Sequence, residues 1–348
     1  MTELFDSLAT EWPWQALVLT MVVTIVILAK GADWLVENAV AISVRLGVPR
    51  ILVGATVVSL GTTTPEAVVS VLSALQGRSE MALGNAVGSI ICDTGLILGI
   101  ACIIAPLPFD RLVVTRQGWF QFACGFLLVL ACVPPTTPFA VFTTGGNLPQ
   151  SAGYVFLVIL TLYMAWSVAL ARNAYVSQQL PTGAPRFGLA RSLFSLVAAV
   201  AIVVATSALL ISVAAETADR LSIPSSVVAA TLVAFGTSLP ELIIVVTASL
   251  KGHGELAVGN VIGADILNVL FVAGAAAAVT PDGLAAGSTF FFIQFPAMLF
   301  VLLVFRIGIW RARKDTFPRS FGYVLLGTYI VVTVISFNFS GHTLGSSG

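Results

Sequence analysis

The chain has 348 residues, of which 58% are hydrophobic and only 9% are charged, and its mean hydropathy is +1.02. This composition excludes a soluble globular domain, and zero net charge without a basic patch argues against binding to nucleic acid. Long apolar runs recur from Trp14 to Phe337, so we expect an all-α polytopic membrane protein, multi-pass in the cell (plasma or inner) membrane.

The apolar runs predict ten transmembrane helices. In chain order they cover residues 14–45, 51–76, 81–105, 117–134, 151–172, 192–219, 226–250, 255–279, 287–308 and 321–338. The longest polar stretch follows the fifth run and contains two prolines and a glycine, which indicates a linker. We therefore expect a first half over 1–172, a cytoplasmic linker over 173–191, a second half over 192–340 and a disordered tail over 341–348.

Lysine and arginine are distributed unevenly between the two sides of these helices. Thirteen fall on the side that carries the central linker, whereas only Arg78 and Arg220 fall on the opposite side. Since positively charged loops stay in the cytoplasm, this distribution predicts a cytoplasmic linker and extracellular termini.

One segment of the chain occurs twice. Residues 53–99 align without a gap with residues 228–274, and 18 of the 47 positions are identical. The matches include a Pro-Glu pair and a Gly-Asn-x-x-Gly pattern, which shared hydrophobicity does not explain. Five predicted helices, an odd number, separate the two copies, so the copies enter the membrane from opposite sides. The pattern therefore predicts an inverted-topology repeat.

Each copy contains an acid that directly follows a proline inside an apolar run. These acids are Glu66, at the end of Gly-Thr-Thr-Thr-Pro-Glu, and Glu241, at the end of Gly-Thr-Ser-Leu-Pro-Glu. A proline within a helix frees backbone carbonyls, and the preceding hydroxyls add further oxygens. Carboxylate, hydroxyl and carbonyl oxygens are the ligands that Ca²⁺ and Na⁺ require. One Pro-Glu pair alone is equally typical of a kinked helix with a satisfied acid, but the symmetric pair indicates one cation site.

A second polar side chain follows each glutamate after 27 residues, namely Asp93 after Glu66 and Asn268 after Glu241. Glycine-containing turns lie between them. At about 1.5 Å per residue, all four side chains lie roughly 18–21 Å from their turns, near the middle of the bilayer. We therefore expect them at one depth. Asn85 and its counterpart in the second copy lie between small residues, so we expect them to join helices rather than bind ions.

Three charged residues lie in or near the first predicted helix. Lys30, Asp33 and Glu37 share one helical face. We expect a local ion pair between Lys30 and Asp33 rather than a part in the cation site.

The two copies resemble the two alpha-repeats of the Na⁺/Ca²⁺ exchanger branch of the calcium/cation antiporter superfamily, in its prokaryotic form. The first copy carries this resemblance in GTTTPE and GNAVGSIICD, and the second carries it in GTSLPE and GNVIGADILN. The resemblance implies a secondary active antiporter, not an enzyme, that exchanges Na⁺ for Ca²⁺ by alternating access with competing ions. We expect Na⁺ and Ca²⁺ to bind as the transported ions and no cofactor to take part. We also expect one monomer to contain the complete site. The implied ligands, with backbone oxygens at the first residue of each set, are Ser59, Thr62, Thr63, Glu66, Ser89 and Asp93, and Ala234, Thr237, Ser238, Glu241 and Asn268.

The chain departs from the family pattern within both repeats. Asp93 and Asn268 are exchanged relative to the microbial pattern, and Ala264 replaces a serine. Ile90 replaces an asparagine, and Asp265 stands at the corresponding place in the second repeat. Asp265 points about 100° away from Ala264, so we expect it to be hydrogen-bonded outside the site, with a place among the ion ligands as the alternative. These departures leave the coupling ion and a K⁺ requirement open.

Other functions remain as alternatives. The same class contains H⁺-coupled antiport of Ca²⁺ or another divalent cation. A distant alternative is an intramembrane enzyme such as a lipid pyrophosphatase, but the repeat cores contain no Arg or Lys to hold phosphate. A passive channel is disfavoured because two symmetric acidic segments at mid-membrane are typical of alternating access.

Overall fold

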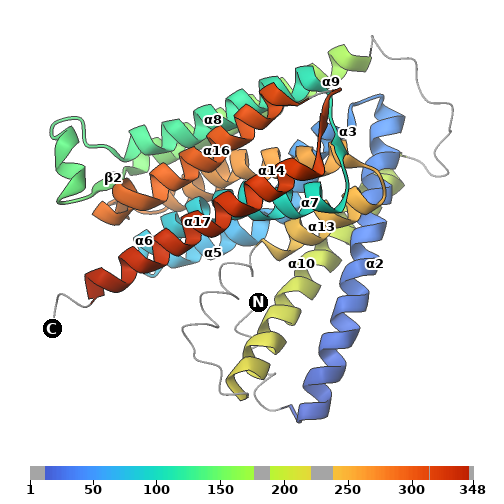
Figure 1. Ribbon diagram of the computed structural model, residues 1–348, viewed down its shortest axis with the longest axis horizontal. Coiled ribbons are helices and arrows are strands. Elements are labelled where there is room, and N and C mark those ends of the chain that lie inside the picture. The colour runs from blue at the N-terminus through green and yellow to red at the C-terminus, as the bar shows by residue number, and fades with distance from the viewer. Residues whose placement is uncertain (1–11, 176–188, 221–237, 313, 345–348) are drawn as a thin grey trace.

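The computed structural model describes residues 12–175, 189–220, 238–312 and 314–344, and these ranges are helical almost throughout (Figure 1). Eight helices in them are long and apolar enough to cross a membrane, or nine if the bent pair Arg50–Thr62 and Thr64–Leu75 forms one span. The helical polytopic membrane architecture is therefore confirmed. The predicted seventh span is described only from residue 238 onward, so the count of ten remains a prediction.

The first half contains α2 (Trp14–Leu46), α3 (Arg50–Val53), η1 (Gly54–Val58), α4 (Ser59–Thr62), α5 (Thr64–Leu75), α6 (Ser79–Ile91), η2 (Cys92–Ile97), α7 (Leu98–Ile104), α8 (Arg111–Cys132), η3 (Pro138–Phe142) and α9 (Gln150–Tyr175). The described part of the second half contains α10 (Leu189–Arg220), α13 (Leu239–Leu250), α14 (Gly254–Leu267), η5 (Asn268–Ala273), α15 (Gly274–Ala278), η6 (Phe290–Gln294), α16 (Phe295–Arg311) and α17 (Arg319–Leu344). The η segments are π-helical except η3, which is a 3₁₀ turn.

The two repeats fold alike. In each of them a helix, α5 or α13, ends in a turn whose glycine has a positive φ, 77° at Gly77 and 73° at Gly252. Glycine adopts this conformation without steric strain. The next helix, α6 or α14, then passes into a π-helical segment that begins at Cys92 or at Asn268. Such segments within α-helices occur often at functional sites.

The helix α14 packs directly on the backbone of the first repeat. A Cβ added at Gly259 would lie 2.2 Å from the carbonyl oxygen of Ile51, and one added at Gly263 would lie 2.5 Å from the Cα of Ala55. Small residues four apart let two helices approach this closely. The two repeats therefore meet with their backbones in contact, and every residue of α14 except Glu255 is buried.

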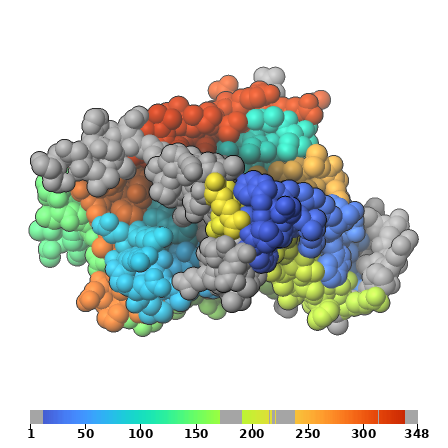
Figure 2. Space-filling view, turned by 90° about the horizontal axis from the view of Figure 1, so that it is seen from below, coloured from blue at the N-terminus to red at the C-terminus, as the bar shows by residue number. Residues whose placement is uncertain are grey.

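Helices α2 and α10 pack side by side and incline away from the rest of the bundle (Figure 1). Figure 2 shows the blue α2 and the yellow-green α10 together on one face of the molecule. Close packing is possible at Gly31, where an added Cβ would lie 3.1 Å from Ile202. The two helices have 33 and 32 residues, more than the roughly 20 that span a bilayer, so they cross the membrane with tilt.

Two short antiparallel sheets join the halves at their loops. β1 (Leu107–Pro108) pairs with β4 (Thr316–Phe317), and β2 (Gly146–Leu148) pairs with β3 (Leu284–Ala286). Each sheet takes one strand from each half. Strands of two or three residues carry no periodic pattern, so the sequence did not predict them.

The start of α8 and the end of α17 differ from the predictions. The α8 helix begins at Arg111 instead of residue 117, because Asp110 caps it by accepting a hydrogen bond from the Val113 amide at 3.0 Å. The α17 helix continues to residue 344 and so enters the tail that we expected to be disordered from 341, since one glycine at 341 does not end a helix.

The predicted ion pair between Lys30 and Asp33 is wrong. Asp33 instead lies 3.1 Å from the ammonium group of Lys251, and Glu37 lies 3.0 Å from the same group. Lys251 belongs to the turn between α13 and α14, so these ion pairs connect α2 to the second repeat.

Candidate cation-binding site

A break in the second span positions the first acid. The axes of residues Arg50–Thr62 and Thr64–Leu75 differ by 43°. Pro65 lies in the first turn of α5, where its missing N–H leaves no hydrogen bond unmade. Glu66 follows it at the positive end of the helix dipole and is only 1% exposed. The kink that the Pro-Glu motif predicted is therefore present.

The second repeat presents its acid in the same way. Pro240 lies in the first turn of α13 and Glu241 follows, also 1% exposed. Ser238 directly precedes the helix and is buried. The predicted ligands Ala234 and Thr237 lie outside the described residues.

Contacts between the repeats bring the predicted residues together. The hydroxyl of Thr63 donates to Oε1 of Glu241 at 3.4 Å, and Thr62 also lies beside this carboxylate. Asn268 Nδ2 lies 3.5 Å from Oδ2 of Asp93. Asp93 and Asn268 are thus in direct contact, whereas a common depth of all four polar side chains in the membrane stays a prediction.

The remaining predicted ligands are also buried. Ser59 is fully enclosed, and its carbonyl accepts hydrogen bonds from the Thr63 amide at 2.8 Å and the Thr62 hydroxyl at 3.2 Å. Ser89 lies on α6 one turn before Asp93 and is 5% exposed. The Ser59 carbonyl is therefore shared with local hydrogen bonds in this structure.

Several oxygens in this cluster lack a hydrogen-bond partner in the described part of the chain. They are Glu66 Oε2, Asp93 Oδ1, Glu241 Oε2, Asn268 Oδ1 and Ser238 Oγ. An unpaired buried polar group costs about 1–3 kcal/mol, and a charged one costs more. The Glu66 carboxylate also lies close enough to those of Glu241 and Asp93 to be repelled by them. A bound cation would supply the missing partner and offset this repulsion.

The acids alone do not complete such a site. Within the described residues, no three Asp, Glu, His or Cys side chains converge as a compact metal cluster. Hydroxyl, amide and backbone oxygens must therefore fill the remaining coordination positions. A mixed oxygen set of this kind suits Ca²⁺ and Na⁺ and disfavours transition metals, which prefer nitrogen or sulfur.

Asp265 belongs to a neighbouring cluster. Its Oδ2 accepts short hydrogen bonds from the Thr94 hydroxyl and from the side-chain amide of Gln121 on α8. This arrangement agrees with the expectation that Asp265 is hydrogen-bonded outside the ion ligands. Thr94 and Gln121 were not predicted. A signal was present, because Gln117 and Gln121 lie four residues apart on one face of an apolar helix.

Asn85 joins two helices, as predicted. Its side-chain amide donates to Ser70 Oγ at 3.0 Å and to the Glu66 carbonyl at 3.4 Å, which ties α6 to α5 behind the acid. Its counterpart Asn260 is fully buried, and its amide has no partner among the described residues.

Known proteins share this sequence pattern and fold. The family model described as "Sodium/calcium exchanger protein" matches residues 16–169 and 191–338. Inner membrane protein YrbG of Escherichia coli is 30% identical over 321 residues, which cover 89% of this chain and 94% of that protein. Sodium/calcium exchanger MaX1 of Methanosarcina acetivorans is 29% identical over 349 residues, covering 92% and 98%. A solved structure of the sodium-calcium exchanger NCX_Mj, soaked with Na⁺ and Sr²⁺, superposes with a TM-score of 0.75 over 91% of this chain and 97% of that one, at 24% identity.

Proposed function

Because the chain belongs to the sodium/calcium exchanger family, we propose that it is a secondary active antiporter that exchanges Na⁺ for Ca²⁺ across the cell membrane. The observation that carries this proposal is the buried acid cluster, in which Glu66 and Glu241 come from opposite repeats and each has an unpartnered oxygen. The family consists of ion transporters, so an intramembrane enzyme is no longer a competing function.

The two glutamates are the central ligands in this proposal, because they are the symmetric acids of the two repeats. The hydroxyls of Thr62, Thr63, Ser89, Thr237 and Ser238, the side chains of Asp93 and Asn268, and the backbone oxygens of Ser59 and Ala234 complete the coordination. Asp265 holds Thr94 and Gln121 and does not bind the ion directly. No resident cofactor takes part, and one monomer contains the whole site.

Charge balance suggests how the two ions compete. Glu66, Asp93 and Glu241 supply up to three negative charges in a buried setting. Three Na⁺ ions would neutralise them, whereas one Ca²⁺ would leave one charge. Because three Na⁺ ions carry one more positive charge than one Ca²⁺, exchange of the two would move net charge across the membrane and is expected to be electrogenic.

We propose ten transmembrane helices with both termini extracellular, as the distribution of Lys and Arg indicates. Pro240 lies in the predicted span over 226–250, whose beginning is outside the described residues. The name of the Escherichia coli relative supports a location in the inner membrane.

Ion flux into reconstituted vesicles tests the exchange. Vesicles that contain the purified chain are loaded with Na⁺ and diluted into Na⁺-free buffer with ⁴⁵Ca²⁺. In two separate experiments, a pH gradient alone or a K⁺ gradient alone replaces the Na⁺ gradient. We expect uptake that requires the outward Na⁺ gradient. Uptake that follows the pH gradient and ignores Na⁺ would instead support H⁺-coupled antiport.

A further inference from the structure

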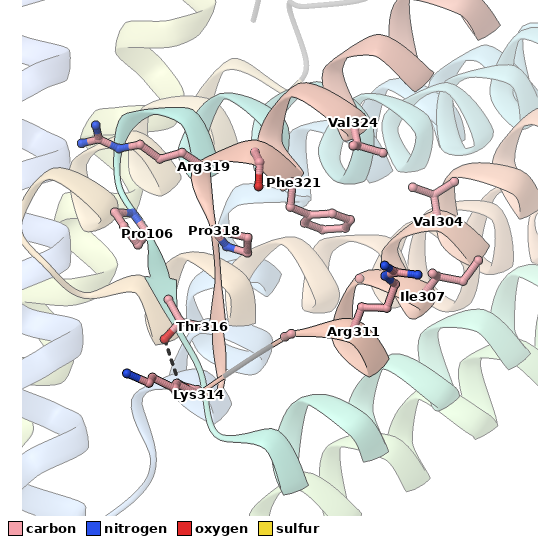
Figure 3. A pocket seen from close by; sticks show the side chains of 13 residues that line it. Pro106, Val304, Ile307, Arg311, Lys314, Thr316, Pro318, Arg319, Phe321 and Val324 are labelled. Carbon is pink, nitrogen blue, oxygen red and sulfur yellow. Dashed lines mark hydrogen bonds between the residues drawn. The ribbon is translucent and has the colours of Figure 1, made fainter.

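A cavity of about 1010 Å³ lies between the end of α16 and the beginning of α17, far along the chain from the acid cluster (Figure 3). Its lining has two parts. The apolar wall consists of Val304, Ile307, Gly308, Phe321 and Val324. The basic rim consists of Arg311, Lys314 and Arg319.

The apolar wall belongs to the lipid-facing surface of the protein. Ile307 and Val324 are 46% and 53% exposed, and Trp310, at the end of α16, is 77% exposed. An exposed tryptophan beside a cluster of cations marks the boundary between acyl chains and headgroups. The cavity therefore opens where a membrane lipid is available.

The shape of the wall is set by tight packing. A Cβ added at Gly308 would lie 2.1 Å from the ring of Phe321, so this ring lies directly on α16. The same ring stacks on Phe317 with the centroids 5.2 Å apart. A cavity that is formed before its ligand arrives loses little conformational entropy on binding.

The basic rim has no carboxylate partner within the described residues. The acid in this loop, Asp315, lies 3.3 Å from Arg111, whose side chain is outside the lining. Arg319 donates to the Ile104 carbonyl at 3.1 Å, and this contact leaves its charge uncompensated. Figure 3 shows Lys314 and Arg319 at one edge of the cavity and Arg311 at the other, beside Ile307. The start of α17 adds the positive end of a helix dipole.

We propose that this cavity binds an anionic glycerophospholipid. The anionic headgroup lies at the basic rim that contains Arg311, Lys314 and Arg319, and an acyl chain lies along Val304, Ile307 and Val324. A soluble anion would leave the apolar wall unused. A zwitterionic lipid would not compensate the charge of the rim. Basic pockets between transmembrane helices are typical sites for anionic headgroups, and the proposal does not depend on which ions the protein transports.

Thermal unfolding of the full chain in detergent, followed by tryptophan fluorescence, tests the proposal. The chain is titrated with phosphatidylglycerol, with phosphatidylcholine and with inorganic phosphate, and the apparent affinity is taken from the rise in Tm. We expect phosphatidylglycerol to raise the Tm at much lower concentration than phosphatidylcholine, and inorganic phosphate to have no effect.

The variant R311Q/K314Q is expected to weaken phosphatidylglycerol binding about 25-fold, since each interfacial cation contributes roughly fivefold. V324W occupies the space beside the apolar wall without changing charge, and it is expected to weaken phosphatidylglycerol binding about fivefold. R116Q removes an exposed cation outside the lining and is the matched control, with binding unchanged. If R311Q/K314Q does not fold, K314Q in the exposed loop is expected to give the fivefold loss.

Three results would overturn the proposal. Equal stabilisation by phosphatidylcholine would show that the headgroup charge is not recognised. Wild-type affinity in the rim variants would show that these cations do not bind the lipid. Stabilisation by inorganic phosphate at the level of phosphatidylglycerol would show an anion site without a lipid chain.

Discussion

The hydroxyl of Thr63 donates a hydrogen bond to the carboxylate of Glu241 at 3.4 Å, although 178 positions separate the two residues. Thr63 lies at the break between α4 and α5, in the first repeat, and Glu241 lies in the first turn of α13, in the second. An ion bound by Glu241 would therefore lie beside groups from both repeats. A change in the angle between α4 and α5 would alter its coordination.

The two glutamates are expected to be indispensable for flux. Glu66→Gln or Glu241→Gln keeps the size of the side chain but removes one of the negative charges that hold the cation. We expect either variant to lower Na⁺-driven ⁴⁵Ca²⁺ uptake at least about 100-fold, since loss of one charged ligand removes roughly 3 kcal/mol or more. Glu80→Gln, at an exposed acid in the first turn of α6, is the control and is expected to transport normally. Flux near the wild-type level in E66Q or E241Q would disprove the assignment.

Asp265 is expected to position its neighbours and not to bind the ion. Asp265→Asn keeps an oxygen that accepts from Thr94 or Gln121, so we expect at least half of the wild-type flux. Asp265→Ala removes the shared acceptor and leaves the Gln121 amide with only the long hydrogen bond to the Thr94 hydroxyl at 3.4 Å, so it is expected to lower the free energy of unfolding by about 1–3 kcal/mol. Flux assays and thermal unfolding of both variants distinguish these effects. Loss of exchange in D265N without loss of stability would place Asp265 among the ion ligands.

The close contact between the repeats gives a prediction about stability. Gly263→Ala would place a methyl group 2.5 Å from the Cα of Ala55, so α14 must move away. We expect a loss of about 1–3 kcal/mol, as for overpacked cores, and a lower Tm. The equivalent glycine of the first repeat is the matched control, because no described atom lies within 4 Å of a Cβ added at Gly88. An unchanged Tm in G263A would contradict the backbone packing.

The repeats could be predicted from the sequence because their determinants are local. A proline before an acid, glycine in the turn and polar residues at a 27-residue spacing all lie within one segment, and the predicted odd number of intervening spans indicates the inversion. Counting residues from Gly77 and Gly252 predicts that the acids lie at one depth.

Contacts between distant segments could not be predicted in this way. Lys30 lies three residues from Asp33, so local spacing favoured the wrong ion pair. The actual partner, Lys251, is 218 positions from Asp33 and reaches it only because α13 packs against α2. The hydrogen bonds from Gln121 to Asp265 and the two small sheets likewise depend on how the halves dock.

His253, beside Lys251 in the same turn, predicts a pH dependence of stability. Burial, together with nearby Arg50 and Lys251, lowers the pKa of His253 below its usual value of 6.5. As the pH falls, His253 is therefore protonated in the unfolded chain before it is protonated in the folded chain. Its contribution to the free energy of unfolding is complete above pH 6.5 and declines as the pH falls below this value.

We expect the Tm to fall between pH 7 and pH 5 by a smaller amount in His253→Gln than in the wild type. Thermal unfolding across this range, in the same detergent, measures the difference. The same pH profile in both proteins would show that His253 does not contribute. The control is His342→Gln, at the only other histidine of the chain, which is expected to leave the profile unchanged.

The central claim is that Glu66 and Glu241 contribute to one site for which Na⁺ and Ca²⁺ compete. Equilibrium binding of ⁴⁵Ca²⁺ to the purified chain, titrated with Na⁺ and in parallel with choline as the inert cation, tests it most directly. We predict that Na⁺ displaces Ca²⁺ completely, that choline does not, and that E66Q and E241Q each abolish the displaceable fraction. Calcium binding that persists at saturating Na⁺, or that survives in both variants, would contradict the claim.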